Sequence, residues 1–253
     1  MSIWDTYESR AAISGRTKRD ALLNRERRLL NTKQQDNLSY HRVIVDGVEK
    51  CVTITNTQNL NEKTIISKNN DDFKCGSYIE WMNNYWLITE YDANTEVYTK
   101  ATMIQCNYLL KWIDNYGAIH EQWCVIEDGT KYMTGEYEDR NFIVTRGDSR
   151  LVMIIAKNEH TTSFTRESRF LIDDPDADTK LSYALTKPLK VGLVYNTDGV
   201  YSFVLQEVSS TEDDNHELSL ADYYKYYPKH NDTHQPEEPD KTDENTNGKT
   251  RWF

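Results

Sequence analysis

Apolar and β-branched residues alternate with polar ones along most of this chain, and short polar turns separate the alternating runs. The densest run covers residues 73–112, and turn signals at Asn83-Asn84 and Asp92-Ala93-Asn94 divide it. This pattern predicts a meander of three or four strands. A buried aromatic ring removes about 150–250 Å² of surface from water. We therefore expect the tryptophans of this stretch to be core residues of a β body: Trp81, Trp86 and Trp112.

The same two-residue period predicts further strands on both sides of this run. Before it, Asp46-Gly47 joins strands at 42–45 and 48–54 as a hairpin, and another strand covers 62–67. After it, a strand at 107–113 pairs across the turn 114–117 with one at 118–127. The remaining strands are expected at 142–145, 151–157, 169–172, 183–186, 191–196 and 201–208, the last two joined by a hairpin at 197–199. Short strands at this spacing predict a β-barrel or β-sandwich.

A helical period replaces the strand period at residues 2–33. Ser2 and Asp5 form a capping-box pattern that begins a first piece, and Gly15 ends or bends it. Thr17 and Asp20 repeat the capping pattern ahead of a second piece. The sequence therefore predicts an N-terminal helical arm, which we place at residues 1–36.

Leucines of the second helical piece recur at a spacing of seven and form a narrow apolar seam: Leu22, Leu23, Leu29 and Leu30. Arg25, Arg27 and Arg28 lie off this seam. In one interpretation the helix lies on the protein's own sheet with a solvated basic face. In the other, the arm docks on another subunit and places its arginines on an acidic surface or on phosphate.

Charge is unevenly distributed along the chain. The formal net charge is −11, yet residues 1–42 hold nine Lys/Arg against five Asp/Glu. The acidic remainder argues against a general DNA-binding surface. We therefore expect the arm to bind a partner protein rather than nucleic acid.

The composition limits the class of protein. The 253 residues suffice for one large β domain or two smaller ones, and 38% hydrophobic content with 17 Tyr suits short, half-exposed strands. No apolar run of about 18 residues is present, so we expect no membrane span. The N-terminal sequence lacks the apolar core of a signal peptide, so we expect no secretion by that route.

The C-terminal segment 209–253 is polar and holds eleven Asp/Glu against five Lys/Arg. We expect an extended acidic tail that is mobile in the free monomer. Aromatic residues interrupt it at 218–227 and at the C-terminus: Tyr223, Tyr224, Tyr226, Tyr227, Trp252 and Phe253. In one interpretation they are anchors, together with Arg251, that become ordered on a neighbouring subunit. In the other, the terminus has no role.

Residues that carry chemistry are sparse. The sequence has no P-loop, GxSxG or HExxH motif. The cysteines lie far apart without a CxxC pair, which favours free buried thiols over a zinc site: Cys51, Cys75, Cys106 and Cys124. The acidic run 173–178 lacks the Gly and Glu of a calcium loop and is better explained as a solvated turn. We therefore expect no enzyme activity, no catalytic residue, no cofactor and no metal.

Three segments resemble structural proteins from the head–tail region of tailed bacteriophages of low-GC Gram-positive hosts. They are WDTYESR…GRTKRDALLNRERRLL, CGSYIEWMNNYWLITEYDANTEVYTKATMIQCNYLLKW and YEDRNFIVTRGDSR. The part GSYIEWMNNYWLITE is also similar to the small β-barrel of head-closure (stopper) proteins. The resemblance covers about residues 1–208, rests on packing residues and implies a virion protein without an active site.

These observations predict a mostly β protein with four parts. They are the helical arm 1–36, a β-barrel-like domain 37–160, a small β domain of immunoglobulin-like size at 161–208, and the tail 209–253. The expected function is a non-enzymatic part of the head-to-tail connector (neck) ring, with 6 or 12 copies that contact portal, adaptor or tail proteins. Packaged DNA would be touched only in the channel, and a membrane not at all.

The protein would be made in the host cytoplasm and reside in the virion. The expected partner-binding residues are Trp4, Tyr7, Arg25, Arg28, Tyr223, Tyr224, Tyr227, Arg251, Trp252 and Phe253. Two alternatives remain open. One is a tail or baseplate adaptor, and the other is a virion carbohydrate-binding module or glycan hydrolase, which exposed Trp and Tyr would serve by stacking on sugars.

Overall fold

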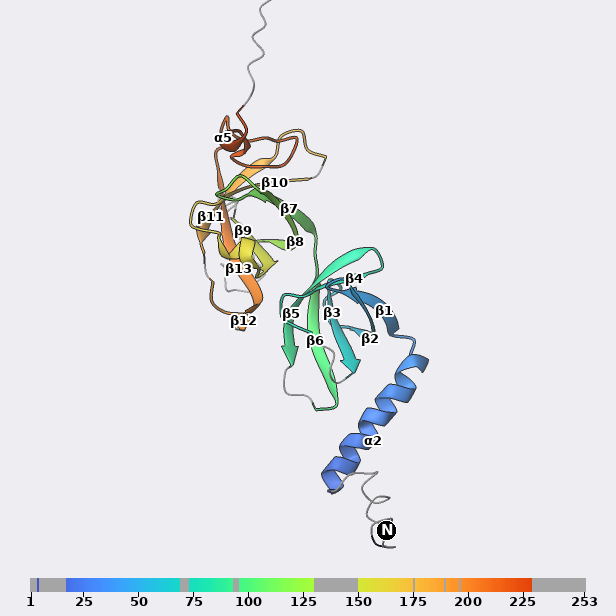
Figure 1. The fold of residues 1–253 in the computed structure, drawn as a ribbon. Coiled ribbons are helices and arrows are strands. Elements are labelled where there is room, and N and C mark those ends of the chain that lie inside the picture. The colour runs from blue at the N-terminus through green and yellow to red at the C-terminus, as the bar shows by residue number, and fades with distance from the viewer. Residues whose placement is uncertain are drawn as a thin grey trace, which may run out of the picture.

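The computed structural model describes residues 4, 17–68, 73–92, 96–129, 150–174, 176–188, 190–195 and 197–228. It is mostly β, with two barrel-like sheets and an N-terminal helix, as the sequence predicts (Figure 1). Several expectations lie outside these residues: the first helical piece that begins at Ser2 and Asp5, the strand at 142–145, and the aromatic residues at 251–253.

The arm helix α2 spans Lys18–Lys33 and is followed by the short 3-10 helix η1, Gln34–Asp36. The expected capping box is confirmed, because the Thr17 side chain accepts a hydrogen bond from the Asp20 amide while the Asp20 carboxylate accepts one from the Thr17 amide. The side chain of Gln34 is buried and donates to Thr53. This contact fixes the end of the arm to the first sheet.

The first sheet closes into a barrel in the order β1-β2-β3-β6-β5-β4. Its strands are β1 Tyr40–Val45, β2 Val48–Asn56, β3 Glu62–Lys68, β4 Tyr78–Trp81, β5 Asn84–Asp92 and β6 Tyr98–Gln105. The expected Asp46-Gly47 hairpin is confirmed, with φ of 48° and 81° at its two turn residues. The turn expected at Asn83-Asn84 lies one residue earlier, at Met82-Asn83, where both φ values are positive.

The second sheet has the order β10-β11-β13-β9-β8-β7, with β12 paired to β13. Its strands are β7 Tyr108–Ile113, β8 Ile119–Asp128, β9 Arg150–Ala156, β10 Arg169–Ile172, β11 Leu181–Lys187, β12 Val194–Tyr195 and β13 Asp198–Val208, and the short helix α4 Glu159–Thr162 follows β9. The sheet curls so that its two end strands approach each other, and the Tyr108 hydroxyl donates to the Leu171 carbonyl.

The division between the two sheets falls between Gln105 and Tyr108. The sequence analysis placed a domain boundary between residues 160 and 161 instead, but β9 and β13, which lie on either side of that point, pair along the whole length of β9. Residues 159–168 form α4 and a loop within the second sheet. The composition of that segment changes because it is a connection, not because the fold divides there.

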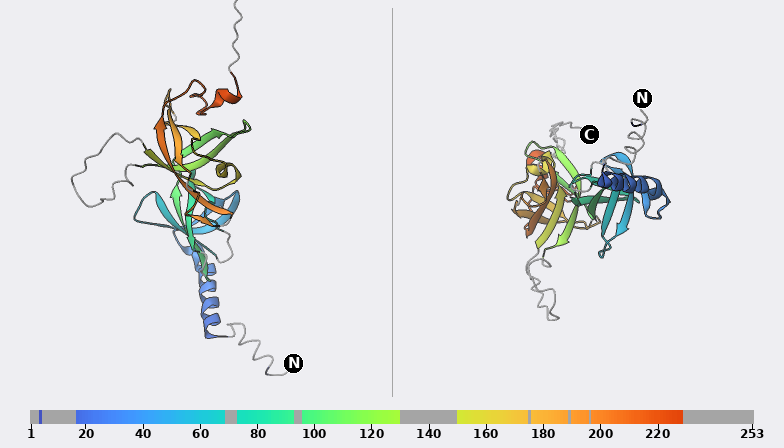
Figure 2. Two further views of the ribbon diagram at one scale, coloured as in Figure 1. Left: turned by 90° about the vertical axis from the view of Figure 1, so that its left-hand side faces the viewer. Right: turned by 90° about the horizontal axis from the view of Figure 1, so that it is seen from below.

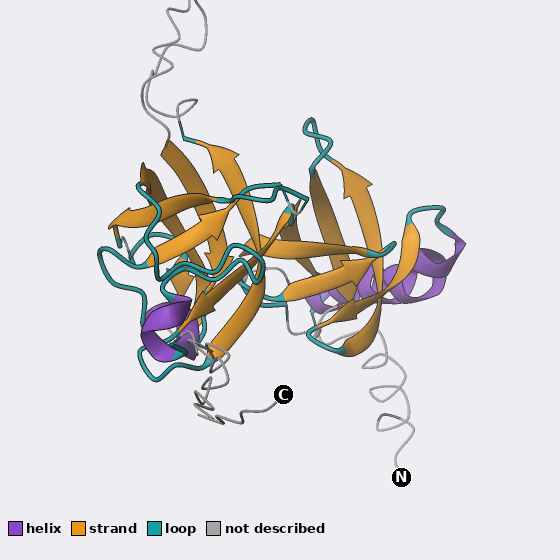
Figure 3. Cartoon of the chain, turned by 90° about the horizontal axis from the view of Figure 1, so that it is seen from above, coloured by secondary structure: helices purple, strands orange, loops and turns teal. Residues whose placement is uncertain are grey.

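The two sheets lie side by side (Figure 3), and they share a small apolar cluster and a close backbone contact. A Cβ atom placed on Gly76 would lie 2.3 Å from the carbonyl oxygen of Gly199, and Gly76 has a φ of 94°. Only glycine permits both this approach and this backbone conformation. Tyr85 and Trp123 stack beside it with ring centroids 4.9 Å apart. The two sheets therefore form one continuous body.

The prediction of a core position is confirmed for Trp86 and Trp112, each of which is 4% exposed. Trp86 lies in the core of the first barrel, and Trp112 lies in the core of the second sheet. Trp81 is only partly buried, and it packs on Trp86 with ring centroids 5.7 Å apart. The four cysteines are free, and three of them are buried. Burial raises the pKa of the Cys75 thiol to about 11 and that of Cys106 to about 12, so both stay protonated at neutral pH.

The expectation of an extended tail is wrong for residues 209–228, which fold against the end of the second sheet; we call this segment the cap. It contains the short helix α5, Tyr223–Tyr226, and buries Leu220 and Ala221. A buried ion pair to the sheet, described below, offsets the polarity of the segment. Residues 229–253 lie outside the described part of the chain.

Candidate partner-binding surfaces

Groups suited to catalysis or metal binding do not gather in the described residues. No three His, Cys, Asp or Glu side chains there are placed to hold a metal ion, and no described helix has the length and apolar character needed to cross a membrane. Two histidine arrangements are nevertheless present. His120 contacts Asp114 at 2.9 Å beside a stacked His160 ring, with centroids 3.9 Å apart, and neither of these imidazoles is hydrogen-bonded to a described hydroxyl or thiol. The Nε2 atom of His216 lies 3.1 Å from the Ser210 hydroxyl, but its Nδ1 atom accepts from the Lys180 amide, so in the neutral ring Nε2 carries the proton and cannot take one from the serine.

The arm presents two different faces, because residues of a helix advance by 100° each. On the inner face, the Arg19 guanidinium lies 2.6 Å from the Glu96 carboxylate, and the Arg27 guanidinium donates to the Glu96 carbonyl. Leu23 and Leu30 lie on this side by periodicity. Every side chain of α2 remains at least partly exposed, so the helix rests on the barrel without entering its core.

The outer face of α2 consists of Lys18, Ala21, Leu22, Arg25, Arg28, Leu29, Thr32 and Lys33 by the same periodicity. It contains four cations, the exposed carboxylate of Glu26 lies at its edge beside Lys33, and Leu22 is 51% exposed. The leucine seam expected from the sequence is therefore divided, with one leucine pair on each face. The first interpretation holds for the inner face, which lies on the protein's own barrel. Docking of the outer face on another subunit stays a prediction.

The cap is fixed to the sheet by Arg169, which projects from β10. Its two terminal nitrogens donate to the two carboxylate oxygens of Asp214 at 3.0 and 2.8 Å, and one of them also reaches Asp222 at 2.8 Å. The Asp214 side chain has no exposed area, and that of Arg169 is 13% exposed. This is a two-pronged, largely buried ion pair, the strong geometry for arginine and carboxylate.

The protonation of Asp214 depends on these contacts. Burial alone raises the pKa of a carboxyl group, but hydrogen bonds from the amides of Thr211 and Asp222 and from Arg169 outweigh it. They hold the pKa of Asp214 well below its usual range. The ion pair is therefore present at neutral pH.

The tyrosines of the cap have partners inside the chain. The rings of Tyr223 and Tyr227 stack with centroids 4.8 Å apart, and the Tyr227 hydroxyl donates to the Gly117 carbonyl. Tyr224 packs edge-on against Tyr223. All three side chains already contact other residues of the chain. As anchors on a partner they could therefore use only their exposed edges.

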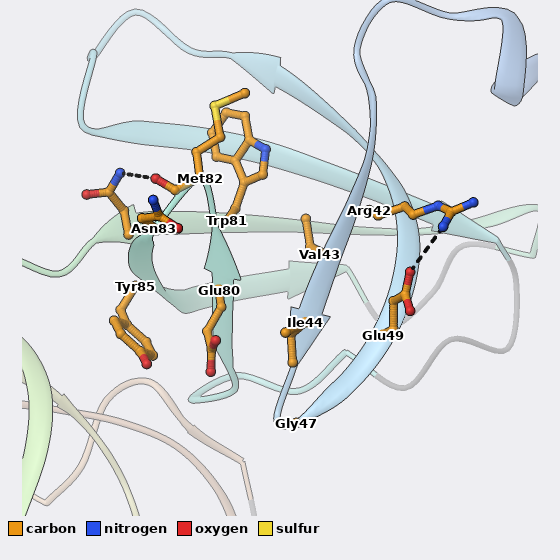
Figure 4. Close-up of a pocket in the computed structure, with 11 residues that line it drawn as sticks. Arg42, Val43, Ile44, Gly47, Glu49, Glu80, Trp81, Met82, Asn83 and Tyr85 are labelled. Atoms are coloured by element: carbon orange, nitrogen blue, oxygen red, sulfur yellow. Dashed lines mark hydrogen bonds and ion pairs between the residues drawn. The ribbon is translucent and has the colours of Figure 1, made fainter.

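A groove of about 610 Å³ lies on the outside of the barrel, where β1 and β4 pair through only two residue positions and then separate (Figure 4). Its walls combine the partly exposed Trp81, the exposed Met82 and the Arg42–Glu49 ion pair of 3.7 Å. Glu80 also projects here. The mixed charge of the groove does not indicate one class of ligand.

The structure brings only some of the predicted partner-binding residues together. Trp4 is 73% exposed, Arg25 and Arg28 lie on the outer face of α2, and the three tyrosines lie in the cap. Tyr7 and residues 251–253 lie outside the described chain. The sequence reasoning missed Arg169, which carries no local signal, because its partners are more than forty residues away.

The sequence model of the family described as the YomX N-terminal domain matches residues 9–105 of this chain. The match ends at the last residue of β6, so it covers the arm and the first barrel. The family is that of a Bacillus prophage protein, and the phage part of the sequence-based expectation is therefore supported.

Comparison with curated proteins gives no match. A solved structure, "MrkH, A novel c-di-GMP dependence transcription regulatory factor", is similar over 76% of this chain and 86% of its own length, with 7% identity and a TM-score of 0.24. A likeness at that TM-score carries no argument about fold or function.

Proposed function

We propose that this protein is a non-enzymatic structural protein of a tailed-phage virion and forms part of the head-to-tail connector ring. The observation that carries the proposal is the outer face of the arm, which displays cations and leucines. No side chain of α2 is buried in the core of its own chain. A helix with such a face is suited to binding another protein. The prophage family match over the arm and first barrel supplies the phage context.

In this proposal the two-sheet body is the rigid unit of a ring of 6 or 12 copies, and the arm reaches a neighbour. The C-terminal residues 229–253 add a second connection. At about 3.3 Å per residue, this length of chain can span roughly 80 Å when extended, enough to cross onto an adjacent subunit. Its terminal Arg251, Trp252 and Phe253 are residue types favoured at binding hot spots.

Deleting residues 1–33 from the protein in a phage that encodes it tests this proposal. The body should remain folded, because α2 contributes no buried side chain within its described range, whereas the deleted protein should be missing from purified particles. Circular dichroism and the melting midpoint verify folding, and mass spectrometry of particles measures incorporation. Normal incorporation of the deleted protein would contradict the proposal.

Electron microscopy of particles that carry a labelled protein separates the alternatives. Label at the neck supports the connector, and label at the distal end of the tail supports a tail or baseplate adaptor. Binding to a glycan array would favour the carbohydrate-binding alternative. That alternative gains no support from Trp86 and Trp112, which are buried and cannot stack on a sugar.

A further inference from the structure

The two ends of the molecule carry opposite charge. Figures 1 and 2 show α2 at one end and α5, within the cap, at the other. The outer face of α2 contains four cations, with the carboxylate of Glu26 at its edge, so cations are in excess there. The opposite end displays exposed carboxylates on the β10–β11 loop and on the cap: Asp174, Asp176, Asp178, Glu212 and Glu217. In the described chain, none of these five acids takes part in an ion pair.

Apolar side chains accompany the charges at both ends. Leu22 is 51% exposed on the outer face of α2. At the opposite end, the Lys180 amide donates to the His216 ring at 3.2 Å and thereby joins the β10–β11 loop to the cap. Leu181, next to Lys180, is 44% exposed, and Leu218, two residues after His216, is 45% exposed. Each end thus combines leucines with an excess of one sign of charge; on the cap, the exposed Lys225 is paired with Asp222.

We propose that the outer face of α2 in one copy binds the acidic end of the next copy, so that identical chains associate head to tail. We call this the arm–cap contact. It rests on the proposed function, because it names the partner of the arm within the ring. A contact between two different surfaces of identical chains closes into a ring when the rotation between neighbours allows it, and otherwise forms a filament.

A second copy fits the arm better than nucleic acid does. Phosphates would pair with Arg25 and Arg28, but they would leave the exposed Leu22 in contact with water. The body behind the arm is acidic and would repel a polyanion. The acidic end of a second copy supplies both partners, because its carboxylates face the cations and its leucines cover the leucines.

Reciprocal charge reversal in the full-length chain tests the arm–cap contact. One variant carries Arg25→Glu and Arg28→Glu, and the other carries Asp176→Lys and Asp178→Lys. Self-association is measured by sedimentation velocity at low and high salt. Each variant alone should associate at least about tenfold more weakly than the natural protein, because two attractive pairs become repulsive. An equimolar mixture should recover association, since each reversed end then meets a complementary end.

A control variant with Lys63→Glu and Lys100→Glu changes the net charge by the same amount as the arm variant, but on barrel strands. It should associate like the natural protein. Failure of the mixture to recover association, or a natural protein that stays monomeric at all concentrations and salts, would overturn the arm–cap contact. Salt-dependent binding of the natural protein to duplex DNA, lost on reversal of the two arginines, would overturn it in favour of nucleic acid.

These outcomes are separate from those of the proposed function. If arm deletion blocks incorporation into particles while the mixed variants stay monomeric, the connector proposal stands and the arm–cap contact falls. The arm would then bind a different virion protein.

Discussion

Replacing Arg169 with methionine should release the cap from the second sheet. The substitution keeps an unbranched side chain of similar length and removes the guanidinium. Asp214 then remains a buried carboxylate whose strongest partner is missing, although the amides of Thr211 and Asp222 still donate to it. Within the sheet the guanidinium makes only one long hydrogen bond, 3.4 Å to the Ser182 hydroxyl, and its other described partners lie in the cap, so the effect should be concentrated in residues 209–228.

The size of the effect follows from the burial of the pair. Breaking a buried ion pair by removing one partner costs about 3–5 kcal/mol, because an uncompensated charge is left in a region of low dielectric. The Asp214 side chain is fully buried and the Arg169 side chain is 13% exposed, so this range applies better than the smaller value for surface pairs. At about 1.4 kcal/mol for each factor of ten, local opening of the cap should become roughly 100-fold to 4000-fold more frequent.

Amide hydrogen exchange with residue resolution measures this opening directly. The informative amides are those of Thr211, Asp222 and Tyr224, each hydrogen-bonded to an acceptor inside the cap. Their exchange should accelerate by the factor above, while amides of the first barrel keep their natural rates. Local opening of this kind has its own free energy, separate from that of global unfolding.

Arg166→Met is the matched control, because Arg166 is an exposed arginine in the loop just before β10. It should leave exchange in the cap unchanged. Adding Asp214→Asn to Arg169→Met should recover part of the loss, since the unpaired charge is then gone. Equal exchange rates in the Arg169→Met and Arg166→Met proteins would refute the view that this ion pair holds the cap.

Three further outcomes are expected. Trp86→Ala should lower the free energy of unfolding by about 3–5 kcal/mol, measured in urea, because a large buried ring is removed; an unchanged midpoint would place Trp86 outside the core. Gly76→Ala should cost more than Gly47→Ala in the same assay, because both glycines have positive φ but only the Cβ at position 76 meets a neighbouring carbonyl, at 2.3 Å. Acidification should loosen the cap: the pKa of Asp214 is depressed in the folded state, so its contribution is complete above the unfolded pKa of about 3.9 and declines as pH falls toward the folded value. The measure is the protection of the cap amides, which is their exchange rate relative to that of an unfolded chain at the same pH. Protection that does not fall below about pH 4 would contradict this last expectation.

Local signals in the sequence predicted the elements that depend on local contacts. The Asp46-Gly47 hairpin follows from the positive φ that this turn requires at both positions. The helix start at Thr17 follows from two side chains that satisfy each other's amides. Most strands were likewise predicted to within a few residues, because alternation with a period of two reflects one buried face.

Partner choice between strands could not be predicted in the same way. The run 73–112 has one continuous pattern, yet β4, β5 and β6 belong to the barrel and β7 opens the second sheet. Alternation of apolar and polar residues predicts that a strand has one buried face. It does not show which of the two cores that face belongs to. The chain crosses between sheets at Cys106 and Asn107, where the composition gives no signal.

The cap was mispredicted for a related reason. A prediction from composition treats each carboxylate of residues 209–228 as unfavourable to bury. Burial of a carboxylate is unfavourable only when it has no partner. Asp214 has its partner in Arg169, and it also accepts hydrogen bonds from Ser182 and Ser210. Such a network becomes favourable only once the distant strands are in place, so no window of sequence contains it.

The arrangement of the sheets explains why assembly would use the ends of the molecule. In the described chain the barrel leaves only short stretches of free strand edge, where β1 and β4 separate, and the curled second sheet brings its end strands together. Contacts with neighbours must then come from side chains on the arm, on the cap and on the barrel surface. The close approach of Gly76 to Gly199 and the apolar cluster beside it hold the two sheets against each other. In a head-to-tail ring the angle between the sheets would set the curvature, so these contacts would influence how many copies close the ring, while the charges at the two ends would determine how tightly they bind.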